Sequence, residues 1–314
     1  MYDLDSLHAP PSLCPLPRST VVAICECYLL VVYGCAPNYQ LGLINPSMHT
    51  YRQLPNLSFP DSQDNMCAVL GLCHFSDELG DDLKVVSVVD FLDNSFERQV
   101  MVYSLRTGLW KQIECTTHDD HVSKFRFPGV TLQKYLFHLI CTETVDCKYY
   151  RFKKIECFDI KAERWGPDVP LPNIHTDGVD FELDEPLHLG VLDEQLCFVV
   201  QNMNESTFDL WVMREYGIKE SWVKLMCLCI SYNPLTFRKG SPHELLCKRD
   251  YSSKLFWYNL EDEDEESIEI EFPGLRTTWG HSSTAYVCKG SLLNIPGSQL
   301  IREWCLEEER KLRS

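Results

Sequence analysis

The stretches YSLRTGLW (Tyr103–Trp110) and FDIKAERW (Phe158–Trp165) share one pattern, in which an apolar residue precedes an aromatic residue by seven positions across a polar turn. INPSMHTY (Ile44–Tyr51) keeps that spacing. VMREYGIKESW (Val212–Trp222) and YNLEDEDEESI (Tyr258–Ile268) are three residues longer, and we interpret them as the same hairpin with an extended loop. Two runs of strand residues joined by a polar turn are typical of a β-hairpin. The chain therefore repeats one hairpin along most of its length.

The residues that end the first four copies are almost evenly spaced. Tyr51, Trp110, Trp165 and Trp222 are 59, 55 and 57 residues apart. A fixed period of about 40 to 50 residues or somewhat more, with several short strands per repeat, is typical of kelch-like propellers. We therefore predict an all-β, kelch-like β-propeller of five or six blades, with these four residues as structural blade anchors. One aromatic per repeat is expected to pack between blades, so loss of Trp165 or Trp222 should cost about 3 to 5 kcal/mol.

Short apolar runs alternate with turn residues from Val21 onward. Strands are expected at 83–91, 98–105, 135–142, 195–201 and 209–213. Residues 1–20 hold four prolines and are expected to be irregular. Residues 298–314 lack Gly and Pro and mix apolar with charged residues, which predicts a charged tail or a short C-terminal helix. The propeller domain is therefore expected to span residues 21–297.

Composition and charge bound the class of protein. The 314 residues are 45% hydrophobic and carry a net charge of −17, which suits one large core and argues against nucleic acid as a partner. The apolar segment Val21–Ala36 is interrupted by Glu26 and is shorter than the roughly 20 residues of a membrane helix. Asp3 and Asp5 argue against a signal peptide. We expect no membrane partner and a place in the cytoplasm or the nucleus.

The 16 cysteines are scattered through apolar runs, which indicates buried thiols in a reducing compartment. The pairs Cys25–Cys27 and Cys227–Cys229 are expected to alternate along strands rather than bind zinc. CTTHDDH (115–121) is the best metal candidate, although a polar loop is the favoured interpretation. HELLC (243–247) begins like a zinc-protease helix but is interpreted as a strand, and EDEDEE (261–266) as a solvated hairpin tip rather than a calcium loop. No metal site is expected.

No sequence motif points to catalysis. The patterns GxGxxG, GxxxxGK and GxSxG are all absent from the chain. We therefore expect no catalytic residue and no cofactor, and a propeller enzyme is the less favoured alternative.

Acidic residues are concentrated in two stretches. Ten Asp or Glu and no Lys or Arg lie between Trp165 and Met213, and eight acidic residues and no basic ones lie between Leu255 and Leu275. Solvated hairpin loops are the favoured interpretation. The alternative is an acidic face that steers a basic protein partner.

Several of these segments resemble plant F-box proteins that carry the F-box-associated propeller domain of the kelch-like type. INPSMHTYRQLP (44–55), QVMVYSLRTGLWKQI (99–113) and FDIKAERWGPDVPLP (158–172) are similar to blade patterns of that family. LWVMREYGIKESWVKL (210–225) is the most specific match. AYVCKGSLLNIPGS (285–298) is similar to the ending of the S-locus F-box subgroup.

The resemblance implies a non-enzymatic role in ubiquitin-dependent protein degradation. In that family the propeller captures a protein substrate, while an F-box docks on the Skp-type adaptor of an SCF-type cullin-RING E3 ubiquitin ligase. The S-locus subgroup further implies basic ribonucleases as clients. Residues 1–40 show no recognisable F-box pattern, so the adaptor and the cullin are expected as partners only where an F-box is present. A truncated propeller that acts as a decoy without adaptor binding is the alternative.

Overall fold

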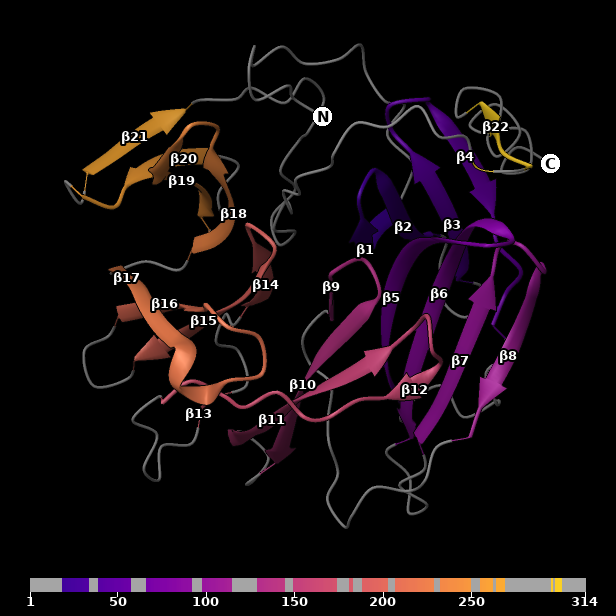
Figure 1. The fold of residues 1–314 in the computed structure, drawn as a ribbon, viewed down its shortest axis with the longest axis horizontal. Helices are drawn as coiled ribbons and strands as arrows, with labels where there is room; N and C mark the ends of the chain where they lie inside the picture. Colours follow the sequence, from indigo (N-terminus) through magenta and orange to yellow (C-terminus); the bar gives the residue numbers. More distant parts are fainter. Residues whose placement is uncertain are drawn as a thin grey trace.

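The chain folds into five antiparallel sheets arranged around a common axis, as seen in a computed structural model (Figure 1). The structure describes residues 19–33, 39–57, 66–91, 98–114, 129–144, 149–173, 181–182, 188–202, 207–228, 232–249, 255–261, 264–268, 295 and 297–300. Each sheet is built from consecutive strands, with one strand from the far end of the chain added to the first sheet. Within the described residues this is an all-β propeller of five blades, which confirms the predicted fold class and agrees with the lower of the two predicted blade counts.

The blades follow one another along the sequence. Blade 1 contains β1 (Ser19–Cys25), β2 (Tyr28–Tyr33), β3 (Gln40–Asn45), β4 (Thr50–Gln53) and β22 (Gln299–Leu300). Blade 2 contains β5 (Met66–Asp77), β6 (Gly80–Phe91), β7 (Arg98–Ser104) and β8 (Leu109–Ile113). Blade 3 contains β9 (Val130–Leu132), β10 (Leu136–Thr144), β11 (Tyr149–Asp159), β12 (Arg164–Trp165) and β13 (Phe181–Glu182). Blade 4 contains β14 (His188–Leu192), β15 (Gln195–Asn202), β16 (Thr207–Met213) and β17 (Trp222–Leu228), with the short 3-10 helix η2 (Lys219–Ser221) between the last two. Blade 5 contains β18 (Tyr232–Arg238), β19 (Ser241–Arg249), β20 (Leu255–Asn259) and β21 (Asp264–Ile268).

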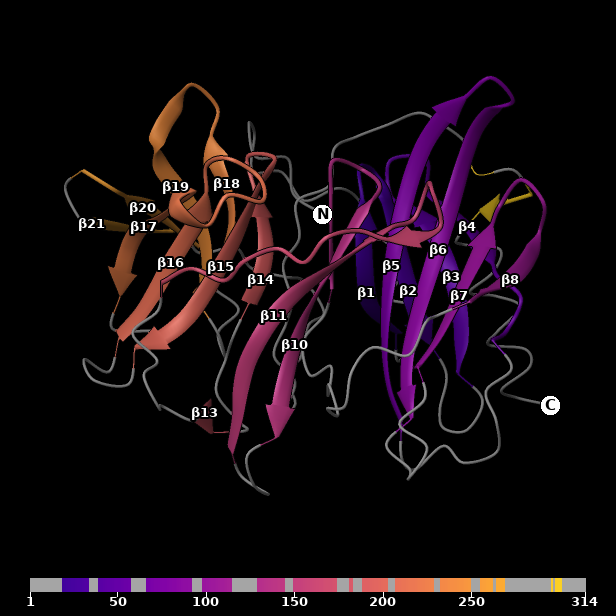
Figure 2. The same ribbon diagram turned by 60° about the horizontal axis from the view of Figure 1, so that its bottom comes forward.

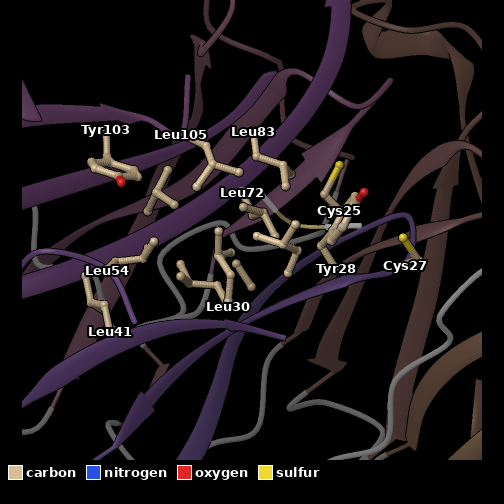
Figure 3. Packing of buried hydrophobic residues seen from close by; sticks show 14 residues of the cluster. Cys25, Cys27, Tyr28, Leu30, Leu41, Leu54, Leu72, Leu83, Tyr103 and Leu105 are labelled. Carbon is tan, nitrogen blue, oxygen red and sulfur yellow. The ribbon is translucent and has the colours of Figure 1, made fainter. Parts of the chain in front are cut away.

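The hydrophobic core lies between blades rather than within them. A blade with neighbours on both sides buries both faces of its sheet, so its middle strands are almost continuously apolar instead of alternating. In β6, for example, Val85, Val86, Val88 and Val89 are all fully buried. Separate clusters join blades 1 and 2, 2 and 3, 3 and 4, and 4 and 5. Figure 3 shows the first of them, where Leu30 and Leu54 from blade 1 approach Leu72 and Tyr103 from blade 2.

The hairpin register confirms the repeat in the first three blades. Tyr103 lies opposite Trp110, Phe158 opposite Trp165, and Ile44 opposite Tyr51, so each pair with the seven-residue spacing is a direct cross-strand pair. The five expected strands are present as β6, β7, β10, β15 and β16. Local spacing and strand composition were therefore sufficient to find these hairpins.

The two longer hairpins differ from the prediction. Trp222 lies opposite Met213 rather than Val212, so the turn of blade 4 is two residues longer than those of blades 1 to 3. In blade 5, Tyr258 lies opposite Glu265, which restores the ordinary spacing of seven, and the predicted extended loop is wrong. The acidic run continues from the turn into β21, the outer strand of blade 5, where charged residues also protect a sheet edge from pairing.

Three further expectations concern the Cys25–Cys27 pair, the two ends of the chain and the absence of a membrane span. Cys25 ends β1 whereas Cys27 lies in the turn that follows, so this pair does not alternate along one strand as predicted. Gln299–Leu300, at the start of the expected tail or helix, forms a strand. Residues 1–18 and 301–314 lie outside the described residues. Among the described residues, no helix is long and apolar enough to span a membrane.

Candidate recognition surface

The propeller has two faces that differ in how the strands are connected. Because consecutive strands are antiparallel, the turns between the first and second strands and between the third and fourth strands of every blade lie at one end. We call this end the turn face; it is uppermost in Figure 2 and comprises residues 26–27, 46–49, 78–79, 105–108, 133–135, 160–163, 193–194, 214–221, 239–240 and 260–261. Most of the connections at the opposite end lie outside the described residues. A candidate site can therefore be built on the turn face.

Three blades are joined by ionic groups on the turn face. Glu26 of the β1–β2 turn lies with Oε2 2.5 Å from Nδ1 of His74 in β5, and its Oε1 accepts a hydrogen bond from Lys134 Nζ at 2.6 Å. Burial opposes the charged carboxylate, but the hydrogen bonds from Lys134 and His74 prevail and lower the pKa of Glu26. The group thus holds the inner turns of blades 1 and 3 against the inner strand of blade 2.

The β5–β6 hairpin of blade 2 rises past the neighbouring β7–β8 turn (Figure 2). Arg106 from that turn holds the tip: its two terminal nitrogens donate to the Asp77 carboxylate at 3.1 and 2.9 Å, and one also donates to the Gly80 carbonyl at 2.7 Å. Leu79, at the tip, is 81% exposed, and Leu109 beside the second turn is 69% exposed. The hairpin therefore displays apolar side chains from a fixed backbone.

The β16–β17 turn of blade 4 reaches across to blade 3. The Tyr216 hydroxyl lies 2.8 Å from Nε2 of His138 in β10 and donates to Cys157 Sγ in β11 at 3.4 Å. Ser221 Oγ closes the turn by donating to the carbonyls of Glu215 and Ile218, both at 2.7 Å. Ile218 stays 46% exposed. This turn is the extended copy in the repeat, and its extra length carries the tyrosine to the preceding blade.

Two buried thiols and one buried imidazole are unsuited to acid–base or nucleophilic chemistry near neutral pH. Burial raises the pKa of Cys25 and of Cys197 to about 12, so both remain protonated thiols. Burial lowers the pKa of His138 to about 4, so its ring is neutral. Within the described ranges, no three His, Cys, Asp or Glu side chains gather in a way that could hold a metal ion.

The four predicted anchors lie apart, one in each of the first four blades, and not in a common site. Two of them bond to the preceding blade: Trp110 Nε1 donates to the Pro55 carbonyl at 2.9 Å, and Trp222 Nε1 donates to the Pro170 carbonyl at 2.8 Å. Sequence reasoning missed these prolines, although each lies a few residues after the anchor of its own blade. The anchor role of the four residues stays a prediction that these contacts support.

The other two anchors have different surroundings. Tyr51 is fully buried and its hydroxyl lies 2.5 Å from that of Tyr33 in the same blade. The Trp165 ring lies 5.3 Å from the guanidinium carbon of Arg98 in blade 2. Its Nε1 is buried without an acceptor, and no proline follows β8 in the described residues up to Glu114. The Trp165 junction therefore depends on cation–π contact and packing.

The motifs considered for metal binding lie in different parts of the chain, and some of them lie outside the described residues. HELLC (243–247) lies within β19, which confirms the predicted strand. EDEDEE (261–266) runs from the turn into β21, with residues 262 and 263 outside the described part. CTTHDDH (115–121) and Cys229 also lie outside the described residues, so the structure does not test them.

The family model of the F-box associated beta propeller domain matches residues 6–279. The chain belongs to this family, and the match covers all five blades up to the end of β21. This confirms the family resemblance of the blade motifs, while membership of the S-locus subgroup stays a prediction.

Curated relatives of the chain are plant F-box proteins. It is 29% identical to F-box protein CPR1 of Arabidopsis thaliana over 282 residues, which is 81% of this chain and 66% of that protein. It is 24% identical to F-box protein At4g22390 of the same plant over 267 residues, which is 77% of this chain and 63% of that protein. The chain thus spans slightly less than two thirds of these relatives. Among solved structures, the chain is similar to dihydro-heme d1 dehydrogenase NirN at 10% sequence identity, and the match covers 87% of this chain and 68% of that protein's chain. The TM-score of this match is 0.27, which is too low to bear on function.

Proposed function

We propose that this chain is the protein-binding part of a substrate receptor of an SCF-type cullin-RING E3 ubiquitin ligase. The observation that carries the proposal is the family match over the whole propeller, together with relatives that are F-box proteins. The propeller binds the client directly, and the Skp-type adaptor and the cullin are partners through an F-box. Ubiquitin transfer is catalysed by other subunits, so this chain itself is not an enzyme. The chain acts in the cytoplasm or the nucleus.

The turn face is the proposed client surface. It presents exposed large apolar side chains at Leu79, Tyr216 and Ile218, and the exposed Leu109 lies directly beside it at the start of β8. Arg106 and Ser221 hold the backbones that carry them, so little conformational freedom is lost when a partner binds. Apolar side chains on a fixed backbone with charged neighbours are typical of protein–protein contact sites.

A ubiquitylation assay tests this function. An F-box segment is fused before Met1 of the full chain, and the fusion is reconstituted with the Skp-type adaptor, cullin and RING subunit in plant extract. Ubiquitin-modified peptides are then quantified by mass spectrometry. We expect a defined set of proteins to gain ubiquitin relative to an F-box segment without the propeller. If no protein gains ubiquitin, the proposed function is wrong.

Paired variants test whether the client binds the turn face, separately from whether the chain is a substrate receptor. Leu79→Asp combined with Ile218→Asp changes two exposed turn-face residues, and Tyr39→Asp is the matched control at an exposed residue of the opposite face. We expect the double variant to lose the modified proteins and the control to keep them. If instead the control loses the modified proteins and the double variant keeps them, the receptor function is supported but the client binds the opposite face.

The charge of the chain favours a basic client. A net charge of −17 and two long stretches without Lys or Arg attract positively charged proteins, and the attraction is strongest at low ionic strength. Basic ribonucleases fit this description and are the client class that the S-locus resemblance implies.

A further inference from the structure

The outer hairpin of blade 4 carries a lysine and a cysteine on one face of its sheet. In the register of β16 and β17, Lys224 lies opposite Trp211 and Cys227 lies opposite Asp209. Trp211 and Asp209 are two residues apart on β16, so they point to the same face. Leu225 is the extra residue of a β-bulge. The bulge brings Lys224 and Cys227 to neighbouring positions on this face.

The carboxylate of Asp209 holds the lysine beside the cysteine. Its Oδ2 accepts a hydrogen bond from Lys224 Nζ at 3.0 Å. Burial raises the pKa of Cys227, and the hydroxyl of Thr207 opposes this effect. The Asp209 carboxylate adds to the rise, whereas the Lys224 ammonium opposes it. Because such influences weaken with distance, the sulfur lies close to both the carboxylate and the ammonium.

Two buried polar atoms at this place have no hydrogen-bond partner in the described structure. Asp209 is only 5% exposed, and its Oδ1 is buried without a donor. Thr207 Oγ1, two residues earlier on the same strand, is also buried without a partner. Buried polar atoms are almost always hydrogen-bonded, so an unpaired carboxylate oxygen beside a thiol requires an explanation. This oxygen is placed to accept a proton from its neighbours.

Both reacting side chains are open to solvent. Among the cysteines whose burial the structure describes, seven are buried and Cys227 is exposed. The side chain of Lys224 is 41% exposed. Cysteine oxidation requires an accessible sulfur. Dissolved oxygen can therefore reach the thiol and the amine together.

We propose that Lys224 and Cys227 form a covalent N–O–S bridge with molecular oxygen, and that the bridge loosens the outer hairpin of blade 4. The S–H bond and two N–H bonds of the ammonium break, one oxygen atom joins sulfur to nitrogen, and the other oxygen atom leaves as water. Sulfur and nitrogen each lose two electrons, and O2 accepts all four. Asp209 Oδ1 takes up the further proton that the ammonium releases. The proposal concerns the covalent chemistry of this chain and stands independently of the ubiquitin-ligase function.

The bridge removes an ion pair that joins β16 to β17. The nitrogen of Lys224 becomes neutral when it is bound to oxygen, so Asp209 loses its charged partner. Asp209 is buried, and loss of one partner of a buried pair is strongly destabilising. These two strands flank the turn that carries Tyr216 and Ile218. Oxidation is therefore expected to increase the opening of this hairpin.

Mass spectrometry of the full-length chain tests the bridge. All chains carry Met226→Leu and Cys229→Ser, because a methionine sulfoxide together with a Cys227–Cys229 disulfide would have the same mass as the bridge. In air-saturated buffer, the peptide that holds Lys224 and Cys227 should gain one oxygen and lose two hydrogens, and dithiothreitol should restore its mass. Cys227→Ser and Lys224→Arg should each abolish this product. Lys219→Arg, at another lysine of the same hairpin, is the matched control and should keep it.

The mass also identifies the competing products. An unchanged mass would overturn the proposal. A gain of oxygen without loss of hydrogen would overturn it in favour of a sulfenic acid, and a loss of two hydrogens without oxygen in favour of a direct bond between sulfur and nitrogen. A product that persists in Lys224→Arg would overturn it as well, because the nitrogen would then come from another residue.

Hydrogen exchange tests the effect on the hairpin. Deuterium uptake in residues 207–213 should increase by about tenfold or more in the bridged chain and should return to its initial level with dithiothreitol. Residues 98–113 of blade 2 should keep their protection, and the air-exposed Lys224→Arg chain should behave like its own reduced form. Equal uptake in the bridged and the reduced chain would overturn the loosening. An equal increase in blade 2 would also overturn it, because the effect would then not be local.

Discussion

The indole nitrogens of Trp110 and Trp222 connect blade 2 to blade 1 and blade 4 to blade 3. Each donates to a proline carbonyl of the preceding blade, and each ring packs into the cluster between the two blades. A proline carbonyl suits this role because proline has no N–H to bind a neighbouring strand, so its segment leaves the sheet while the carbonyl remains an acceptor. These residues therefore combine apolar burial with a directional bond.

Truncation of Trp222 tests this role. Trp222→Ala should lower the free energy of unfolding by about 3 to 5 kcal/mol, because it leaves a cavity and an unpaired carbonyl at Pro170. Chemical denaturation measures the change. The control is Leu109→Ala at an exposed position, which should stay within about 0.5 kcal/mol of wild type. A loss below about 1 kcal/mol in Trp222→Ala would show that the indole does not anchor the blades.

Gly71 permits close contact between blades 2 and 3. A β-carbon at this position in β5 would lie 2.4 Å from Cδ2 of the fully buried Phe137 ring in blade 3. Gly71→Ala should therefore force the blades apart and cost about 1 to 3 kcal/mol, measured by thermal unfolding. Gly166→Ala is the control, because its nearest neighbour would be 3.7 Å away. Equal stability of the two variants would refute this reading of the junction.

The strands of blades 2 and 3 are also joined by buried charges. Arg98 in β7 donates to Asp90 of its own blade at 2.7 Å and to Glu156 of blade 3 at 2.6 Å. Burial raises the pKa of Asp90, whereas Arg98, Cys141 and Lys154 outweigh burial and lower that of Glu156. The paired cluster fixes the relative position of two strands that have no backbone ladder in common.

Removal of the shared cation tests this junction. Arg98→Met leaves Asp90 and Glu156 buried without their main partner and should cost about 3 to 5 kcal/mol at neutral pH. The cost should shrink in acid as the carboxyl groups become protonated. Urea denaturation at neutral and at acidic pH measures both effects. Lys111→Met, which removes an exposed ion pair with Glu163, should change stability by less than about 1 kcal/mol.

The buried His138, which contacts the Tyr216 hydroxyl, makes the junction of blades 3 and 4 sensitive to acid. Burial lowers the pKa of His138 to about 4 from its ordinary value of 6.5. The unfolded chain therefore binds a proton that the folded chain rejects between these two pH values, so stability should fall as the pH drops through this window. We expect an effect of about 3 kcal/mol across the window. Denaturation of wild type and His138→Gln measures it, and an equally steep acid loss in both chains would exclude His138 as its source.

The ring as a whole carries a strong negative charge on a scaffold whose blades repeat. Stability then depends on junctions between neighbours, whereas association with a partner depends on the summed field of the molecule. The charge is concentrated in stretches of sequence without basic residues, and the turn face itself carries both signs, with Lys134 and Arg106 already paired to Glu26 and Asp77. Long-range attraction and short-range apolar contact therefore involve different residues.

Salt dependence tests the attraction. Binding of a basic ribonuclease to the purified chain should weaken strongly between about 50 mM and about 500 mM salt, because counterions screen the field over distances beyond the Debye length. Isothermal titration calorimetry measures the affinity, with an acidic protein of similar size as the control. An affinity that does not change with salt would exclude electrostatic recruitment of this client class.

The hairpins and the propeller class could be predicted because the contacts that define them are local. Ile44 and Tyr51, or Phe158 and Trp165, are seven residues apart and pair across one turn, so spacing and residue type are sufficient. The same reasoning wrongly predicted an extended loop in blade 5, where Tyr258 pairs with Glu265. Apolar and acidic residues both fit an edge strand, so the composition did not determine the register there. Local pattern therefore determined the blades and most of their internal pairing.

The contacts between blades could not be predicted in this way, because they join residues that are far apart in sequence. The bond from Trp222 to Pro170 joins residues 52 apart in sequence, the ion pair of Arg98 and Glu156 joins residues 58 apart, and the pairing of β22 with β4 joins Leu300 to Thr50. No periodic signal in one chain encodes which distant residues will meet, because that depends on how whole sheets pack around the axis. The sequence thus specified the blade, and packing in three dimensions specified how the blades are held together and which faces are left open to a partner.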